Sequence, residues 1–262
     1  MPRSGFAAHI CLPRRSCPPR RSADLRDARS CVGLIGTDGT NFLPGTFLAR
    51  LGEEERDAIL KLGVRRNIKR GATLIHQDEY DDRVMLVLRG RVKVSCVDEN
   101  GGEVILGIRD PGDLVGEVGF IDSQPRLACV TALDRVVTLV MPSSTFRSHL
   151  ASAPLVTGIL LELMAHRLRE ASLLGLRFAR ADTMGRLAAR IVELAERYGE
   201  STPAGFTVAL PFSQDELAAW TGSSRAGVKQ SLHAMRDLGW IQTERMRLLV
   251  RDLTALRARS AQ

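Results

Sequence analysis

The sequence predicts an α+β protein with an N-terminal β-rich domain, a long helix and a C-terminal winged helix-turn-helix domain. Three observations lead to this fold: closely spaced β-branched runs before Pro142, a helical period after it, and two short helices around a glycine turn near the C-terminus. The chain has 262 residues, of which 44% are hydrophobic and 26% charged. This composition is typical of a chain that forms a packed core.

Short β-branched segments alternate with turn residues between Ala72 and Pro142, after a helix expected over Glu53–Leu62. The run Asn100-Gly101-Gly102 is a strong hairpin signal. Short strands at such regular spacing indicate a β-barrel or a sandwich. We therefore expect a β-rich sensor domain over residues 41–142.

From about Pro142 the hydrophobic period changes from 2 to 3.6, and apolar or small residues recur at spacings of 3, 4, 3, 4 and 3. They are Leu161, Met164, Leu168, Ala171, Gly175 and Phe178. Such a stripe can pack on its own domain. A single helix over residues 143–180, between two compact halves, instead favours pairing with a second copy, so we predict a dimerisation helix.

Two short helices around a glycine turn are expected near the C-terminus. A capping box over Ser213–Glu216 starts the first, and Gly222 ends it. Ser223 or Ser224 caps the second, and Gly239 ends it. This pattern predicts a helix-turn-helix.

Further elements complete the expected DNA-binding domain over residues 181–262. A helix over Met184–Tyr198 precedes it, and Gly199–Gly205 is expected to form a loop. The segments Ile241–Glu244 and Leu248–Asp252, joined at Arg245-Met246-Arg247, predict a β-wing.

With these elements the sequence resembles the cyclic-AMP receptor/FNR (Crp/Fnr) family of bacterial transcription regulators, from about Leu43 to Arg257. The most specific matches are Thr73–Gln77, Arg89–Val94, Pro111–Glu117, and Ser224-Arg225 after Gly222. The resemblance implies a cyclic-nucleotide-binding-type β-roll and a homodimer that binds a pseudo-palindromic site in double-stranded DNA. It also implies RNA polymerase as a partner.

The resemblance further implies an effector pocket in the β-roll, matched by Gly116-Glu117-Val118 and by Pro125-Arg126-Leu127. A glutamate can accept from a ribose hydroxyl and an arginine can pair with a cyclic phosphate, while backbone N–H groups near Gly116 complete an anion site. The alternative is that Glu117 and Arg126 form a salt bridge in an empty pocket.

The sequence departs from the family's pocket at two places. Leu127 stands where the family has a small or hydroxyl residue, and Ala171-Ser172 stands at the family's adenine-contacting Thr-Ser pair. Losing one neutral hydrogen bond costs about 0.5–1.5 kcal/mol, or about 2- to 13-fold in affinity. We therefore expect weak binding of cyclic AMP or another cyclic nucleotide. The same fold acting without nucleotide, or sensing another small molecule or a redox signal, remains the alternative.

The resemblance also implies which side chains contact DNA. Arg225, Ala226 and Gln230 match base-reading positions, and Gln214, Ser223, Ser224 and Lys229 lie nearby for phosphates. Arginine can contact guanine and glutamine can contact adenine through paired hydrogen bonds. Ala226 departs from the best-studied members, which carry an acidic residue there, so we do not transfer their operator sequence.

Charge is unevenly distributed along the chain, whose net charge is +7. Residues 1–31 hold seven Arg and two Asp, and the Arg-, Pro- and Ser-rich stretch to about residue 40 predicts a disordered basic tail. Residues 177–262 are also basic, which suits a phosphate-rich partner. We find no apolar run long enough to cross a membrane and no secretory signal, and we expect a cytoplasmic protein.

Two other function classes fit the sequence less well. The five cysteines have neither cluster nor zinc-site spacing, so we expect no metal and no disulfide framework, and His76 suits a structural role better than haem ligation. The five histidines are scattered, and there is no GxSxG, HExxH or Walker-type motif, so we do not expect an enzyme.

Overall fold

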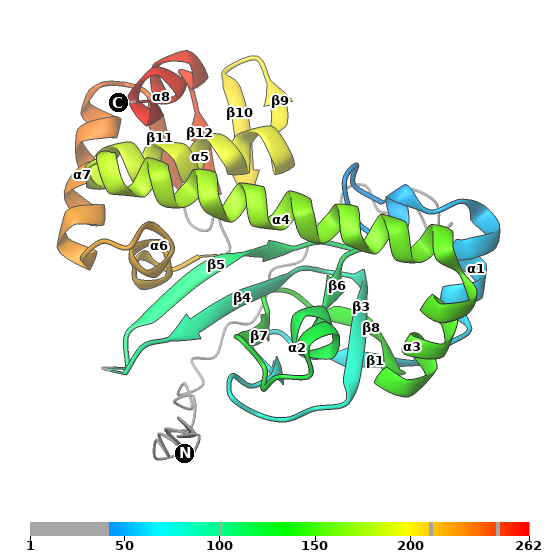
Figure 1. Cartoon of the computed structure of the whole chain (residues 1–262). Helices are drawn as coiled ribbons and strands as arrows, with labels where there is room; N and C mark the ends of the chain where they lie inside the picture. Colours follow the sequence, from blue (N-terminus) through cyan, green and yellow to red (C-terminus); the bar gives the residue numbers. More distant parts are fainter. Residues whose placement is uncertain (1–41, 100, 210–211, 245–246, 262) are drawn as a thin grey trace, which may run out of the picture. The chain divides into compact units, whose positions relative to one another are not determined.

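The computed structural model describes residues 42–99, 101–209, 212–244 and 247–261 (Figure 1). The tail expected over residues 1–40 lies outside the described residues, as do Arg245 and Met246 of the predicted wing turn.

Two antiparallel four-stranded sheets form the β-rich domain, with strand orders β1-β8-β3-β6 and β2-β7-β4-β5. The strands are β1 (Val64–Ile68), β2 (Thr73–Ile75), β3 (Arg83–Arg89), β4 (Val92–Val97), β5 (Glu103–Arg109), β6 (Leu114–Val115), β7 (Cys129–Ala132) and β8 (Val136–Pro142). A short helix, α2 (Glu117–Asp122), lies between β6 and β7, and η1 (Leu48–Arg50) and α1 (Glu53–Leu60) precede the sheets. The expected β-rich N-terminal domain is confirmed.

The hairpin between β4 and β5 forms where the glycines predict it. Gly101 has φ +82°, a backbone conformation that glycine adopts without steric cost. The backbone N–H of Asp98 donates to the carbonyl of Gly102 at 2.9 Å, and that of Gly101 donates to the carbonyl of Asp98 at 2.9 Å. This turn fixes the register that places β5 next to β4.

The expectation of one helix over residues 143–180 is wrong at one point, because the structure has two helices there. These are α3 (Ser143–Ser152) and α4 (Pro154–Arg180), which meet at 112°. Proline is accommodated in the first turn of a helix but disfavours helical geometry in the residue before it, so Ala153 has φ −127° and ψ 77° and separates the two helices. The long helix of the fold is therefore α4 alone.

The C-terminal domain contains helices α5 (Thr183–Tyr198), α6 (Gln214–Thr221), α7 (Arg225–Asp237) and α8 (Leu253–Ser260). Its sheet has the order β11-β12-β10-β9, with strands β9 (Glu200–Thr202), β10 (Gly205–Ala209), β11 (Ile241–Glu244) and β12 (Arg247–Val250). The two wing strands form as predicted, and β11 has the expected bounds. Strand β12, expected over Leu248–Asp252, instead begins at Arg247 and ends at Val250. The loop expected over Gly199–Gly205 is instead mostly a hairpin, because β9 pairs with β10, which pairs with the wing strand β12.

The helix-turn-helix forms through the local hydrogen bonds that the sequence predicts. The Ser213 hydroxyl accepts from the backbone N–H of Glu216 at 3.2 Å, and the Glu216 carboxylate accepts from the backbone N–H of Ser213 at 2.9 Å. Gly222 follows α6 with φ +57°, and the Ser224 hydroxyl caps α7 by accepting from the N–H of Gly227. Buried Trp220 and Met235 belong to the apolar core that joins these helices to α5.

No single described helix is long and apolar enough to cross a membrane. Helices α3 and α4 reach the required length and apolar composition only when they are taken together as a bent pair.

Candidate effector and DNA-binding sites

Arg126 lies at the centre of the predicted effector pocket and is 3% exposed. Its guanidinium donates to three backbone carbonyls, those of Gly116, Asp81 and Arg83. It also lies 3.8 Å from the Asp81 carboxylate. Burial acts to raise the pKa of Asp81, but Arg83 and Arg126 outweigh it, so this pKa lies below its ordinary value. The carboxyl of Asp81 is therefore held in its ionised form beside Arg126.

Gly116 allows Arg126 to reach this position. Its φ of +80° is in the left-handed region, and a Cβ on Gly116 would lie 3.0 Å from an Nη of Arg126. The glycine therefore serves both the backbone turn into α2 and the close approach of the guanidinium.

Glu117 does not pair with Arg126, so the expected alternative of a Glu117–Arg126 salt bridge is wrong. Its buried carboxylate pairs with Arg167 of α4. The same guanidinium donates to the Asp113 carboxylate and to the Leu114 carbonyl, each at 3.2 Å. Sequence reasoning missed Arg167, because a partner 50 residues away leaves no local signal.

The other predicted pocket residues are mostly exposed. Val118 and Leu127 are exposed, Leu127 by 61%, and Pro125 is half-buried. Leu127 therefore does not fill the space beside Arg126. On α4, Ala171 and Ser172 are exposed, and the Ser172 hydroxyl donates to the Leu168 carbonyl of the same helix at 2.9 Å. Within the described residues neither of them forms a hydrogen bond with Glu117 or Arg126.

The six residues of the predicted dimer seam differ in exposure. Leu161, Leu168, Ala171 and Gly175 are exposed. Met164 is half-buried against the β-roll core. Phe178 is half-buried, and the guanidinium groups of Arg186 and Arg190 lie 5.7 and 5.3 Å from its ring centroid. One face of α4 thus leaves a stripe of leucines uncovered within the protomer.

The predicted DNA-contacting residues lie on α7 and in the turn before it, except Gln214, which is the first residue of α6. Gln214, Ser224, Arg225, Ala226, Lys229 and Gln230 are exposed, and Ser223 is half-buried. On the opposite side of α7, Val228, Leu232 and Met235 are buried in the domain core. The buried apolar side of α7 therefore fixes the orientation of its exposed polar face.

Two further residues join this face that the sequence reasoning did not select. His233 is exposed and lines the same shallow hollow on α7 as Lys229 and Gln230. His233 could have been selected from the sequence, because it follows Lys229 by one helical turn and so lies on the same face of α7. Exposed Asp215 of α6 lies 3.4 Å from the Nε of Arg225 and so forms an ion pair with a predicted base-reading side chain.

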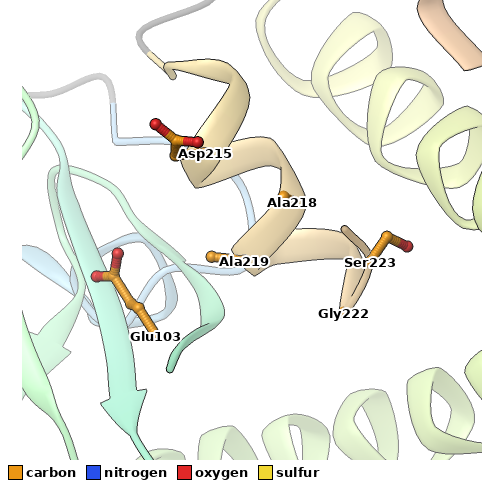
Figure 2. Close-up of a pocket in the computed structure, with 6 residues that line it drawn as sticks. All are labelled: Glu103, Asp215, Ala218, Ala219, Gly222 and Ser223. Atoms are coloured by element: carbon orange, nitrogen blue, oxygen red, sulfur yellow. The ribbon is translucent and has the colours of Figure 1, made fainter. Parts of the chain in front are cut away.

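A cleft borders the helix-turn-helix on the side of β5 (Figure 2). Its lining residues are Glu103, Asp215, Ala218, Ala219, Gly222 and Ser223. Figure 2 shows the carboxylates of Glu103 and Asp215 on the two sides of the cleft, one on β5 and one on α6. Both carboxylates are paired with cations, since Glu103 lies 2.7 Å from the Nζ of Lys93 and Asp215 lies 3.4 Å from the Nε of Arg225.

Comparisons with known proteins match both domains. A cyclic nucleotide-binding domain matches residues 65–153, and a Crp-like helix-turn-helix domain matches residues 185–259. The chain is 32% identical over 193 residues to the CRP-like cAMP-activated global transcriptional regulator of Mycobacterium tuberculosis, covering 73% of this chain and 85% of that protein. It is 28% identical over 192 residues to the cyclic AMP receptor protein of Thermus thermophilus, covering 73% and 86%.

Solved structures show the same fold. The c-di-GMP responsive global regulator CLP of Xanthomonas campestris matches with a TM-score of 0.70 at 18% identity, over 77% of this chain and 100% of that chain. A CooA variant from Carboxydothermus hydrogenoformans matches with a TM-score of 0.68 at 22% identity, over 82% and 95%.

Proposed function

Because the chain belongs to the Crp/Fnr family of transcription regulators, we propose that it is a homodimer that reads a pseudo-palindromic DNA site with the exposed face of α7. The arrangement of α7 carries this proposal. Arg225 and Gln230 are exposed on a helix whose other side is fixed in the core by Val228 and Met235. Arginine and glutamine are the side chains that read guanine and adenine edges in the major groove.

DNA selection followed by affinity measurement tests the proposal. A site enriched from random duplexes is expected to contain two half-sites with centres about 34–36 Å apart, as for other dimeric helix-turn-helix proteins. Arg225→Ala should lose about 1–3 kcal/mol on this site and little on random DNA. Lys229→Ala, the matched variant at a phosphate position, should weaken binding to all sequences and flatten the dependence on salt.

Two outcomes count against this assignment of roles. Equal losses for Arg225→Ala on selected and random DNA would show that Arg225 contacts only phosphate. A selected site without two-fold symmetry would contradict a dimer that reads two half-sites.

As a second function we propose that the cluster around Glu117 and Arg126 binds a cyclic nucleotide weakly. The buried arginine beside a left-handed glycine and the buried glutamate are the observations in favour, together with two relatives described as cAMP-activated or as a cyclic AMP receptor. Calorimetry with a panel of cyclic nucleotides tests it. A panel without any heat of binding would contradict it and favour a regulator that acts without nucleotide or responds to another signal.

Family membership also supports three further proposals. The second copy pairs along the exposed leucines of α4, RNA polymerase is a partner of the DNA-bound dimer, and the protein acts in the cytoplasm without catalysing a reaction. Transcription in vitro from a promoter that carries the selected site tests the polymerase contact.

A further inference from the structure

We infer that Asp110 is a positioning residue that links the effector cluster to the DNA-binding domain within one protomer. The inference rests on the proposed function, in which Glu117 belongs to the effector site and α7 reads DNA. It follows from a continuous series of hydrogen bonds and ion pairs that runs from Glu117 to the end of α5.

The first part of the series lies in the β-roll. One side of the Arg167 guanidinium pairs with Glu117, and its other terminal nitrogen donates to Oδ1 of Asp113 at 3.2 Å. The second oxygen of Asp113 accepts from the backbone N–H of Asp110 at 3.0 Å. Arg167 thus connects the effector cluster to the turn that holds Asp110.

This turn is held rigidly, so a change at Asp113 is transmitted to Asp110. The backbone N–H of Asp113 donates back to the Asp110 carbonyl at 3.0 Å, and the N–H of Gly112 donates to the Val87 carbonyl at 2.7 Å. A Cβ on Gly112 would lie 2.6 Å from the Thr46 hydroxyl oxygen. Hydrogen bonds and close packing therefore leave the turn little freedom to absorb a movement locally.

The last part of the series crosses to the DNA-binding domain. The Tyr198 hydroxyl lies 3.0 Å from each carboxylate oxygen of Asp110, and Arg197 forms an ion pair with the same carboxylate. Both residues are at the C-terminal end of α5. Helix α5 shares a buried core with α7, through Leu187, Ile191, Val228 and Met235. A displacement of Asp110 therefore acts on the helix that supports the DNA-reading face.

Asp110 is 1% exposed, so its carboxylate depends on these partners. Burial raises the pKa of Asp110, while Arg197 and the Tyr198 hydroxyl oppose this shift. Burial and the neighbouring Asp110 also raise the pKa of Tyr198, which keeps its hydroxyl protonated as a donor. The contact of Asp110 with Arg197 and Tyr198 is therefore buried, and water cannot readily replace either partner.

An effector would act on this series at its first member. A ribose hydroxyl that donates to Glu117 competes with Arg167 for the same carboxylate, and so changes how Arg167 holds Asp113. A ligand can shift a conformational equilibrium only by its differential affinity for the two arrangements, and this competition supplies such a difference. The test therefore measures the coupling between the two ends of this series directly.

The test is a double-mutant cycle on affinity for the selected DNA site, with no nucleotide present. Arg167→Lys keeps the charge but replaces the planar guanidinium with a single ammonium, so it cannot hold Glu117, Asp113 and the Leu114 carbonyl in the same geometry. Tyr198→Phe removes only the hydroxyl. We expect the effect of the double variant on Kd to differ from the product of the single effects by about 2- to 30-fold. The difference should disappear when the cycle is repeated with Asp110→Ala.

Lys93→Gln provides the matched control. Lys93 of β4 also joins the β-roll to the DNA-binding domain, since its Nζ lies 2.7 Å from Glu103 and 3.2 Å from Glu216 of α6. It belongs to neither the Glu117–Arg167 pair nor the Asp110 contact. Coupling that persists with Lys93→Gln but not with Asp110→Ala supports the inference. Loss of coupling in both backgrounds overturns it, because general loosening of the domains would then suffice.

Hydrogen exchange gives a second readout that does not depend on DNA binding. Arg167→Lys should change amide protection in the last turn of α5 in the wild-type background and not with Asp110→Ala. Where Asp110→Ala does not fold, Asp110→Leu takes its place, because a branched apolar side chain fills the site and removes both the charge and the acceptor for Tyr198. Changes confined to the β-roll, or multiplicative effects on Kd, overturn the inference. Failure of the unmodified protein to bind DNA would instead count against the proposed function.

Discussion

Arg126 has a structural task in addition to its proposed task of binding a phosphate. Its terminal nitrogens donate to three carbonyls from two segments, at Gly116 and at Asp81 and Arg83. Buried carbonyls that lose their donors retain the cost of desolvation. A variant at Arg126 therefore affects stability as well as any nucleotide response, and the two effects have to be measured separately.

We predict that Arg126→Ala lowers the free energy of unfolding by about 1–3 kcal/mol, because three part-buried carbonyls lose the guanidinium that donates to them. Chemical denaturation at a fixed protein concentration measures this. Arg83→Ala is the control, since Arg83 is more exposed and its pair with Asp81 at 2.7 Å is a contact of the kind worth at most about 1 kcal/mol. Equal destabilisation by the two variants would show that the carbonyl contacts of Arg126 contribute little.

At the scale of elements, local chemistry explains which parts of the fold could be predicted. The capping box at Ser213 and Glu216, the hairpin at Gly101 and the helix end at Gly239 each depend on residues within a few positions of one another. Gly239 has φ +73°, directly after α7 and its C-cap Leu238. Such signals are complete in the sequence, so these boundaries could be predicted to within a few residues.

Contacts between distant segments could not be predicted in the same way. Arg167 reaches Glu117 across 50 residues, and Asp110 meets Tyr198 across 88. The break before Pro154 was missed because proline is compatible with a first helical turn, and the apolar period continues on both sides of it. The pairing of β9 with β10 was missed because a three-residue strand is too short to show a period.

Helix α4 has two apolar faces with different partners. Val156, Leu160 and Leu163 recur at spacings of 4 and 3 and are buried in the core shared with the β-roll. Leu161 and Leu168 are 63% and 70% exposed, one heptad apart. The first face fixes α4 to its own domain, and the second is available for another copy.

We predict that Leu168→Glu shifts the protein from dimer toward monomer, because it places like charges face to face in an apolar seam. Sedimentation or light scattering at micromolar concentration measures this. Met164→Glu is a poorer test, because Met164 also packs against the core of its own domain. Arg169→Glu, at an outer heptad position, should leave the dimer intact. A wild-type monomer under these conditions would contradict the predicted seam.

At the scale of the whole molecule, the effector cluster, α4 and the DNA-reading helix are joined in two ways. The first is the Arg167–Asp113–Asp110 series within one protomer. The second is α4 itself, which carries Arg167 and the two positions proposed to face adenine, Ala171 and Ser172, on one continuous helix. A nucleotide base that contacts α4 would therefore add to the differential affinity that Glu117 and Arg126 supply.

The missing hydroxyl at Ala171 makes this second contribution small in the unmodified protein. We therefore predict substantial DNA binding without ligand and only a modest gain on adding cyclic AMP, since a ligand shifts an equilibrium only as far as its two affinities differ. Ala171→Thr should restore one hydrogen bond and strengthen cyclic AMP binding about 2- to 13-fold, with a larger gain in DNA affinity. Calorimetry measures the first effect, and DNA binding with and without cyclic AMP measures the second.

The control for this variant is Ala165→Thr, which makes the same change at another exposed position of α4. Both variants pay the same cost in helix propensity, so only a new contact with the nucleotide distinguishes them. Leu127 is exposed and should not obstruct the restored contact. Equal cyclic AMP affinity of the two variants would show that the base does not reach Ala171. Tight cyclic AMP binding by the unmodified protein, with DNA binding strictly dependent on it, would show instead that Glu117, Arg126 and Arg167 alone supply the difference between the two arrangements.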